Sequence, residues 1–119
     1  MNRQNEEPNA ARVGRGASPG RACGKAHVIR TAADALAMPS GSILVARIVH
    51  PHMAPLMAAA AGVLLEEGSL LQHATTLARE FGIPAIVGLR DATAVYTNGE
   101  LLELDGSEGT VTRRGQLGK

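Results

Sequence analysis

Short apolar runs alternate with helix-forming segments along the middle of this chain, and this alternation restricts its fold more than any other feature. The runs SILVA (42–46), VLLE (63–66) and IPAIVG (83–88) are each flanked by turn-forming residues. Runs this short and this apolar are typical of buried strands. Buried strands separated by helices predict an α/β domain of two or three layers.

The segments between these runs have helical start and stop signals. Because proline suits a first helical turn and glycine suits a C-terminal cap, residues 51–62 (PHMAPLMAAAAG) predict a helix capped by Gly62. Another helix is predicted from the region of His73 to Phe81, with Gly82 as its cap. The stretch TAADALAMPSG predicts a short helix that ends before Pro39.

The two ends of the chain complete this outline. A first strand is expected through Ala26–Ile29. Near the other end, Asn98-Gly99 predicts a hairpin turn, and a final pair of strands is expected there as well. We expect residues 1–13 to be a flexible tail, residues 14–114 to be one domain and residues 115–119 to be a short C-terminal tail.

The composition excludes several classes of function. A chain of 119 residues that is 45% hydrophobic is long enough for one domain with an ordinary core. Its 12 Lys and Arg nearly balance its 11 Asp and Glu, and Tyr96 and Phe81 are its only aromatic residues, so nucleic-acid binding is not expected. Cys23 is the only cysteine, and no apolar stretch approaches the roughly 18 residues of a membrane span. We therefore expect a cytoplasmic protein with no membrane partner.

His73 has the most distinctive surroundings of any candidate for chemistry. The stretch EEGSLLQH leads from a glycine-marked loop into the predicted helix. A neutral imidazole attacks phosphorus well, and the ordinary histidine pKa of about 6.5 leaves most imidazole neutral at pH 7. The N–H groups and positive dipole end of a helix N-terminus favour phosphoryl oxygens. The spacing alone therefore fits a phosphoryl acceptor, and it also fits a surface or capping residue.

A local pattern defines the expected start of this helix. Ser69 and Gln72 have the S-x-x-Q spacing of a capping box, in which each side chain satisfies a backbone N–H near the other residue. This places His73 just beyond the first helical turn, with Thr76 on the same face. The Thr76 hydroxyl could then contact a ring nitrogen or a phosphoryl oxygen.

The stretch GSLLQHATTLAREFGIPAIVG (68–88) resembles the phosphohistidine signature of the mobile, swivelling domain of PEP-utilising enzymes, a family that includes pyruvate phosphate dikinase and PEP synthase. Three further stretches resemble other parts of that domain. They are GASPGRACGKA near its start, GSILVARIVHPHMAPLM in its middle and NGELLELDGSEGTV near its end. Together the four motifs cover residues from Gly14 to Thr112, almost the whole of the predicted domain.

The resemblance implies a single α/β domain of the swivelling β/β/α phosphohistidine type that works as a swinging arm. His73 would accept a phosphoryl group from an ATP- or PEP-dependent partner and pass it to an acceptor such as pyruvate. The implied partner is an ATP-grasp nucleotide-binding domain, a PEP/pyruvate-binding domain or both. No cofactor or metal is expected on this chain, since Mg²⁺ and ATP or PEP would belong to the partner's site. The residues expected to support the phosphoryl group are Gly68, Ser69, Gln72, Thr76 and His50.

Several hydroxyl groups of the family pattern are missing from this sequence. Gln72 stands where the family has serine, Ser69 replaces the second glycine, and Leu65 replaces a threonine. The threonine before the proline of the family's T-x-P segment is also absent, and we expect His50 there to face the phosphohistidine loop. We expect Ser69, Gln72 and Thr76 to supply part of the lost hydrogen bonding.

Other residues have plainer interpretations. His50 and His52 flank a proline and suggest zinc, but zinc needs at least three well-placed ligands and the sequence pins no third one nearby. Arg79 points away from the His73 face on a straight helix, so a structural contact explains it as well as a phosphate contact does. Glu67 is expected to face water, because a carboxylate beside a phosphoryl group would repel it.

Two alternatives to a phosphoryl carrier stay open from the sequence. One is a degenerate domain that docks on a partner and regulates it without carrying phosphate, which the missing hydroxyls favour and the retained His73 disfavours. The other is a structural swivelling domain of another enzyme class, similar in fold to the mobile domain of aconitase.

Overall fold

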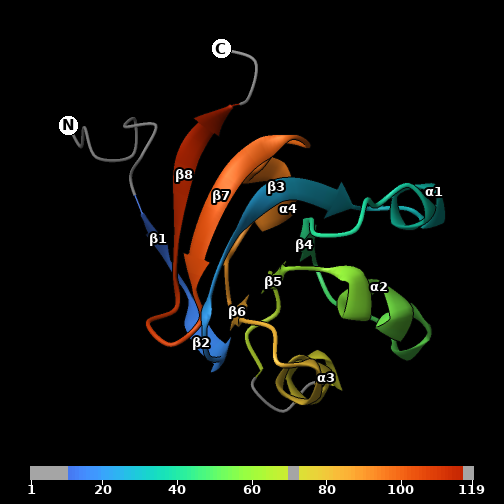
Figure 1. The fold of residues 1–119 in the computed structure, drawn as a ribbon, viewed down its shortest axis with the longest axis horizontal. Helices are drawn as coiled ribbons and strands as arrows, with labels where there is room; N and C mark the ends of the chain where they lie inside the picture. Colours follow the sequence, from blue (N-terminus) through green and yellow to red (C-terminus); the bar gives the residue numbers. More distant parts are fainter. Residues whose placement is uncertain (1–10, 70–72, 117–119) are drawn as a thin grey trace.

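The computed structural model describes residues 11–69 and 73–116, in which a curled sheet packs against short helices (Figure 1). The strands are β1 (Arg12–Val13), β2 (Arg15–Ser18), β3 (Arg21–Ile29), β4 (Ile43–Ala46), β5 (Gly62–Leu65), β6 (Ala85–Val87), β7 (Glu100–Asp105) and β8 (Thr110–Gln116). The helices are α1 (Ala32–Leu36), α2 (Ala54–Ala59), α3 (His73–Phe81) and α4 (Ala92–Val95), with a 3₁₀ turn, η2 (Pro51–Met53), before α2. In this described part, no helix is long and apolar enough to cross a membrane.

Four parallel strands in the order β3–β4–β5–β6 form the centre of the sheet. All residues of β4 and β5 are buried, as their uninterrupted sequences ILVA and GVLL require. The predicted buried strands within residues 42–46, 63–66 and 83–88 are therefore confirmed. Parallel neighbours need crossover connections, and these connections form α1, then η2 with α2, and then α3.

Antiparallel strands extend the sheet at both sides of this centre. On one side β7 pairs with β3, β8 with β7 and β1 with β8, and on the other side β2 pairs with β6. Strands β1 and β2 are consecutive in the chain and are joined by Gly14, so the two edges of the sheet meet there. The Gly14 N–H donates a hydrogen bond to the Gly109 carbonyl oxygen at 2.8 Å, which holds the β7–β8 turn against this junction.

The curl brings β2 so close to the β7–β8 turn that only glycine fits at two positions. A Cβ built on Gly16 would lie 2.1 Å from the Gly106 carbonyl oxygen. A Cβ built on Gly106 would lie 1.9 Å from the Ser18 carbonyl oxygen. Both distances are far inside van der Waals contact, so the glycines in GASPG and DGSEG are needed where these two stretches meet.

Two apolar cores lie on the two faces of the sheet. Leu44 and Met57 belong to the core under the helices, whereas Leu64, Tyr96 and Leu102 belong to the core on the other face. In Figure 1, α1, α2 and α3 lie on one side of the parallel strands, and β7 and β8 curve over the other side. The three layers are the antiparallel strands, the parallel strands and the helices, and they confirm the predicted β/β/α fold.

Two local expectations are wrong. Gly62 does not cap α2, because the cap is Ala60 and Gly62 already begins β5. Asn98-Gly99 is not a hairpin turn, because the residues before it form α4 and not a strand. The Asn98 side chain instead accepts a hydrogen bond from the Val28 N–H at 2.6 Å, a contact with a strand far away in the sequence.

The sheet also extends into segments that were expected to be tails. Arg12 and Val13 form β1, and β8 continues to Gln116. Both segments are strands because β1 pairs with β8 and β8 pairs with β7. The rest of each expected tail, 1–10 and 117–119, lies outside the described residues.

Candidate functional site

The parallel strands all end at one edge of the sheet, and the candidate site lies at this edge. Arg30 follows β3, Arg47 follows β4 and Glu66 follows β5. In α/β sheets, ligands bind outside the carboxyl ends of the strands. The loop that begins at Glu66 and leads to His73 leaves from this edge, so the glycine-marked stretch lies where such sheets place their chemistry.

Backbone hydrogen bonds fix the start of this loop on both sides. The Glu66 N–H donates to the Ala46 carbonyl oxygen and the Glu67 N–H donates to the Arg47 carbonyl oxygen, both at 3.1 Å. The Glu67 carbonyl oxygen accepts from the Gly88 N–H at 2.9 Å. The loop therefore starts between the end of β4 and the end of β6.

Gly68 continues this fixed segment. A Cβ built on Gly68 would lie 3.6 Å from the Gly88 Cα, and Gly88 has a φ of 74°, a conformation that favours glycine. The Arg15 guanidinium donates to the Gly68 carbonyl oxygen at 3.2 Å. Gly68 thus holds the loop against its neighbours through its backbone.

The Glu66 side chain connects the loop to α4. Its Oε2 accepts hydrogen bonds from the Thr93 N–H at 2.9 Å and from the Thr93 hydroxyl at 2.6 Å. These two hydrogen bonds lower the pKa of Glu66, and the positive charges of Arg47 and Arg30 lower it further. The Arg30 guanidinium also donates to the Thr93 carbonyl oxygen. Thr93 is therefore held by a carboxylate at one end and by a guanidinium at the other.

The next carboxylate, that of Glu67, faces water as expected. It pairs with the Arg47 guanidinium at 3.2 Å, with the side chains of Arg47 and Glu67 61% and 51% exposed. An ion pair this exposed contributes at most about 1 kcal/mol to stability. Its significance is spatial, because it places Arg47 beside the loop that leads to His73.

His73 is exposed and is the first described residue of α3. Ala74, Thr75 and Ala78 face the core, whereas Thr76 is exposed like His73. The first turn of a helix presents unpaired backbone N–H groups and a positive dipole end, both of which favour an anion. The arrangement places the His73 imidazole within reach of solvent at the described N-terminal end of α3.

Two expectations about residues near His73 stay predictions. The described part of α3 is His73–Phe81, and residues 70–72 before it lie outside the described residues, so the capping box of Ser69 and Gln72 and the place of His73 just beyond the first turn are not tested. Gln72 lies outside the described residues, whereas Ser69 is described and exposed. The ring contact of His50 is a stack on His52, with centroids 5.7 Å apart and planes 8° from parallel. That His50 faces the phosphohistidine loop stays a prediction.

The structure also bears on the histidine pair His50 and His52 and on Arg79. Within the described residues, neither His50 nor His52 belongs to a group of three or more side chains that could hold a metal ion. The Arg79 Nε donates to the Ala17 carbonyl oxygen at 2.8 Å. Arg79 therefore connects α3 to β2, which is the kind of structural contact that its position on the helix allowed.

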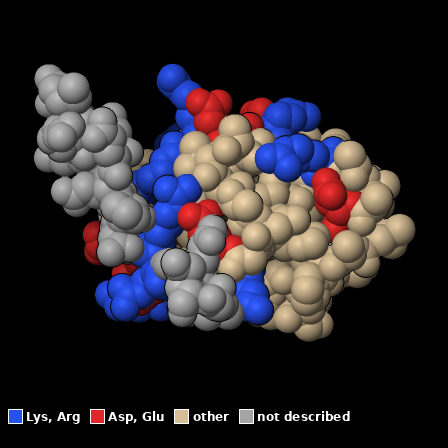
Figure 2. All heavy atoms as spheres, turned by 90° about the horizontal axis from the view of Figure 1, so that it is seen from above, with Lys and Arg blue, Asp and Glu red and all other residues tan. Residues whose placement is uncertain are grey.

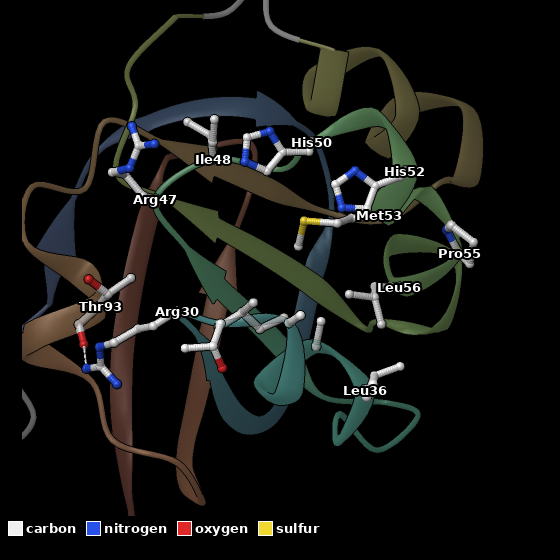
Figure 3. A pocket seen from close by; sticks show the side chains of 14 residues that line it. Arg30, Leu36, Arg47, Ile48, His50, His52, Met53, Pro55, Leu56 and Thr93 are labelled. Carbon is white, nitrogen blue, oxygen red and sulfur yellow. Dashed lines mark hydrogen bonds between the residues drawn. The ribbon is translucent and has the colours of Figure 1, made fainter.

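Sequence reasoning missed a groove next to this loop. An open cavity of about 780 Å³ is lined by residues of α1, η2 and α2 and by residues that follow β3 and β4 (Figure 3). Its polar lining consists of Arg30, Thr31, Arg47, His50, His52 and Thr93. The sequence does contain one signal for this groove. An arginine directly follows each of the apolar strands β3 and β4, and the ends of two neighbouring parallel strands lie close together.

Comparison with known proteins shows which family this chain resembles. The family model of the mobile domain of PEP-utilising enzymes matches residues 38–109. The prodigiosin synthesizing transferase PigC of Serratia marcescens is 46% identical over 99 residues, which make up 82% of this chain and 11% of that protein. A probable phosphoenolpyruvate synthase of Pyrococcus abyssi is 38% identical over 106 residues, 89% of this chain and 13% of that protein. The chain thus spans only a small part of the length of these curated relatives.

Solved structures show the same fold. A solution structure of Enzyme I superimposes with a TM-score of 0.58 and 27% identity, covering 67% of this chain and 33% of that one. Aconitase X of Thermococcus kodakaraensis superimposes with a TM-score of 0.68 and 18% identity, covering 87% of this chain and 97% of that one, a likeness of fold alone. The family model covers more than half of the chain, and the two curated relatives match over most of it. The chain belongs to the family of PEP-utilising enzyme mobile domains.

Proposed function

We propose that this chain is a phosphoryl carrier in which His73 accepts a phosphoryl group from an ATP- or PEP-dependent partner and passes it to an acceptor such as pyruvate. The observation that carries this proposal is the position of His73. It is exposed at the described start of α3, and the segment from Glu66 to Gly68, which precedes it in the chain, is held at the carboxyl edge of the sheet. Membership of the mobile-domain family supports the same role.

The proposed chemistry needs only the imidazole from this chain. In the accepting step, a ring nitrogen of His73 attacks phosphorus, an N–P bond forms, and the P–O bond to the donor breaks with the electron pair leaving on the donor oxygen. In the delivering step, an acceptor oxygen attacks the same phosphorus and the ring nitrogen recovers its electron pair. Mg²⁺ and the nucleotide or PEP would be held by the partner, which would neutralise the charge of the phosphoryl donor.

The proposal gives the neighbouring residues supporting roles. Thr76 is exposed one turn after His73, where its hydroxyl would contact a phosphoryl oxygen. Ser69, Gln72 and His50 would supply further hydrogen bonds in place of the hydroxyl groups that this sequence lacks. Thr76→Val and Ser69→Ala test this division of roles, and unchanged phosphorylation rate and phosphohistidine lifetime in both variants would contradict it.

A carrier of this kind needs partners, and the comparisons support that need. The curated relatives are several times longer than the matched region, which is 11–13% of their length. We propose that an ATP-grasp domain, a PEP/pyruvate-binding domain or both supply and receive the phosphoryl group, on the same chain or on another.

Labelled donors test the proposal most informatively. The 119-residue chain would be incubated with host-cell extract and one of two labelled donors. The donors are PEP with a labelled phosphoryl group and ATP labelled at its β or γ phosphoryl group. We expect the label on the wild-type chain with one of these donors, and none on His73→Ala. Adding pyruvate should then move the label from the chain into PEP.

The same experiment separates the carrier from the binding module. An extract that labels a known family member and leaves this chain unlabelled would contradict the proposal. That result, together with capture of a nucleotide-binding partner from the same extract, would favour a degenerate domain that docks without carrying phosphate.

A further inference from the structure

The groove between α1 and α2 is a second candidate site, which shares His50 with the proposed phosphoryl site but is not lined by His73. Its volume of about 780 Å³ lies in the range of roughly 300–1,000 Å³ in which small-molecule sites are found. His73 and Thr76 are not among the residues that line it. The groove therefore needs an explanation of its own.

One part of the groove wall is apolar. Leu36 of α1 is 89% exposed, and with Met53, Pro55 and Leu56 it forms an apolar surface across the space between the two helices. Figure 3 shows Leu36, Leu56 and Pro55 gathered at one end of the groove. Residues 48–65, which contribute η2, α2 and β5, contain no Asp, Glu, Lys or Arg.

The opposite part of the groove is cationic and rich in hydrogen-bond donors. Arg30 and Arg47 lie there, with Thr93 beside Arg30, whereas His50 and His52 lie along the rim (Figure 3). None of the described residues that line the groove is Asp or Glu. A guanidinium has five N–H donors, so the bond from Arg30 to Thr93 and the pair between Arg47 and Glu67 leave donors for a further oxygen ligand.

Two carboxylates moderate this positive charge without filling the groove. Glu66 directs its Oε2 to Thr93, and Glu67 pairs with Arg47 on a side of the molecule that is open to water. In Figure 2, the charged side chains gather mainly over part of the visible surface, and uncharged residues form a broad area beside them.

We propose that this groove binds a small organic anion that has an apolar body. Its carboxylate or phosphate group would accept hydrogen bonds from Arg30 and Arg47, with the imidazoles of His50 and His52 at the rim. Its apolar body would lie between α1 and α2 against Leu56. Binding does not require a phosphoryl group on His73, so the site extends beyond the proposed carrier function.

The test uses the whole chain and ligands that separate head group from body. Hexanoate and hexyl phosphate carry both parts, hexanol has only the body, and acetate and inorganic phosphate have only the head. Binding is measured by NMR titration of methyl groups, with Met53, Leu36 and Leu56 as reporters in the groove. We expect saturable shifts at these methyls, with hexanoate or hexyl phosphate binding about tenfold more tightly than hexanol or the bare anions. A preference between the two identifies the head group.

Matched variants show whether the arginines do the binding. We expect Arg47→Gln and Arg30→Gln each to weaken binding about tenfold, and Leu36→Ser, which changes an exposed side chain, to weaken it as well. Arg114→Gln is the control, because Arg114 is an exposed arginine of β8 that pairs with Glu103. Hexanol binding as tightly as hexanoate, arginine variants that bind normally, or shifts confined to another face would each overturn the proposal. Circular dichroism of every variant tests whether it is folded. Labelling of His73 in Leu36→Ser tests the carrier function separately, and we expect it to be unchanged.

Discussion

The Glu66 carboxylate accepts two hydrogen bonds from Thr93, one from the backbone N–H and one from the hydroxyl. Glu66 begins the loop that leads to His73, whereas Thr93 belongs to α4 and is 27 residues further along the chain. The position of the loop therefore depends on a contact between two distant segments.

We expect Thr93→Val to raise the pKa of Glu66 toward its ordinary value of 4.5, because the hydroxyl that favours the charged carboxylate is gone. A pKa that is lower in the folded than in the unfolded chain stabilises the fold above the unfolded value, and this stability is lost as the pH falls through the folded value. The variant should therefore lose about 1 kcal/mol of unfolding free energy at neutral pH and less in acid. NMR titration of Glu66 measures the change in its pKa, and urea unfolding at neutral and at acid pH measures the change in stability.

Thr97→Val is the control for this prediction, since Thr97 is exposed and, within the described residues, only its backbone makes hydrogen bonds. An unchanged Glu66 pKa in Thr93→Val would mean that the hydroxyl does not hold the carboxylate.

The order of strands and helices could be predicted because the information is local. The apolar runs of β4, β5 and β6 and the capping Gly82, with a φ of 71°, indicate their structures within a few residues. The failures are non-local. Asn98-Gly99 has the sequence of a hairpin turn, but Asn98 bonds to Val28 of a distant strand, and Arg12–Val13 is a strand only because β8 lies beside it.

The candidate site was predictable to the same extent. His73 and Gly68 stand out because they belong to one continuous stretch that resembles a known motif. Arg30, Arg47 and Thr93 come from three separate segments and meet only after the strands pair. No local pattern marks such a meeting, so the groove could not be predicted from the sequence.

Close packing at the junction of the sheet edges predicts a large cost for one small substitution. In Gly106→Ala the new Cβ would lie 1.9 Å from the Ser18 carbonyl oxygen, so backbone must move. We expect a loss of about 3 kcal/mol or more in urea unfolding. Gly41→Ala is the comparison, because Gly41 has a φ of 84° and no neighbour within 4 Å of its Cβ, and it should lose only about 1 kcal/mol. A smaller loss for Gly106→Ala than for Gly41→Ala would contradict the described junction.

Thr75 predicts a substitution that stabilises the protein. Its side chain is 2% exposed, and within the described structure its hydroxyl has no hydrogen-bond partner. Thr75→Val keeps the shape and removes the unsatisfied hydroxyl, so the unfolding free energy should rise by about 1 kcal/mol. The same change at the neighbouring, exposed Thr76 should alter stability by less than about 0.5 kcal/mol. A loss of stability in Thr75→Val would show that its hydroxyl does have a partner.

Arg79 should matter for stability and not for chemistry. Arg79→Met removes the hydrogen bond to the Ala17 carbonyl oxygen and should cost about 1 kcal/mol in thermal or urea unfolding. Phosphorylation of His73 should continue at the wild-type rate, because Arg79 bonds to β2. Arg90→Met, at an exposed arginine, provides the baseline for removing one positive charge. A stable Arg79→Met variant that accepts phosphate slowly would instead place Arg79 at the phosphoryl site.

The central claim is that His73 carries a phosphoryl group, and intact-mass analysis tests it most directly. The purified chain is incubated with host-cell extract and ATP or PEP, and His73→Ala, His50→Ala and His52→Ala are treated in parallel. We predict one added phosphoryl group that is lost in acid and kept in base, absent from His73→Ala and present in the other two variants. An added group that persists in His73→Ala, or no added group in an extract that phosphorylates a known family member, would contradict the claim.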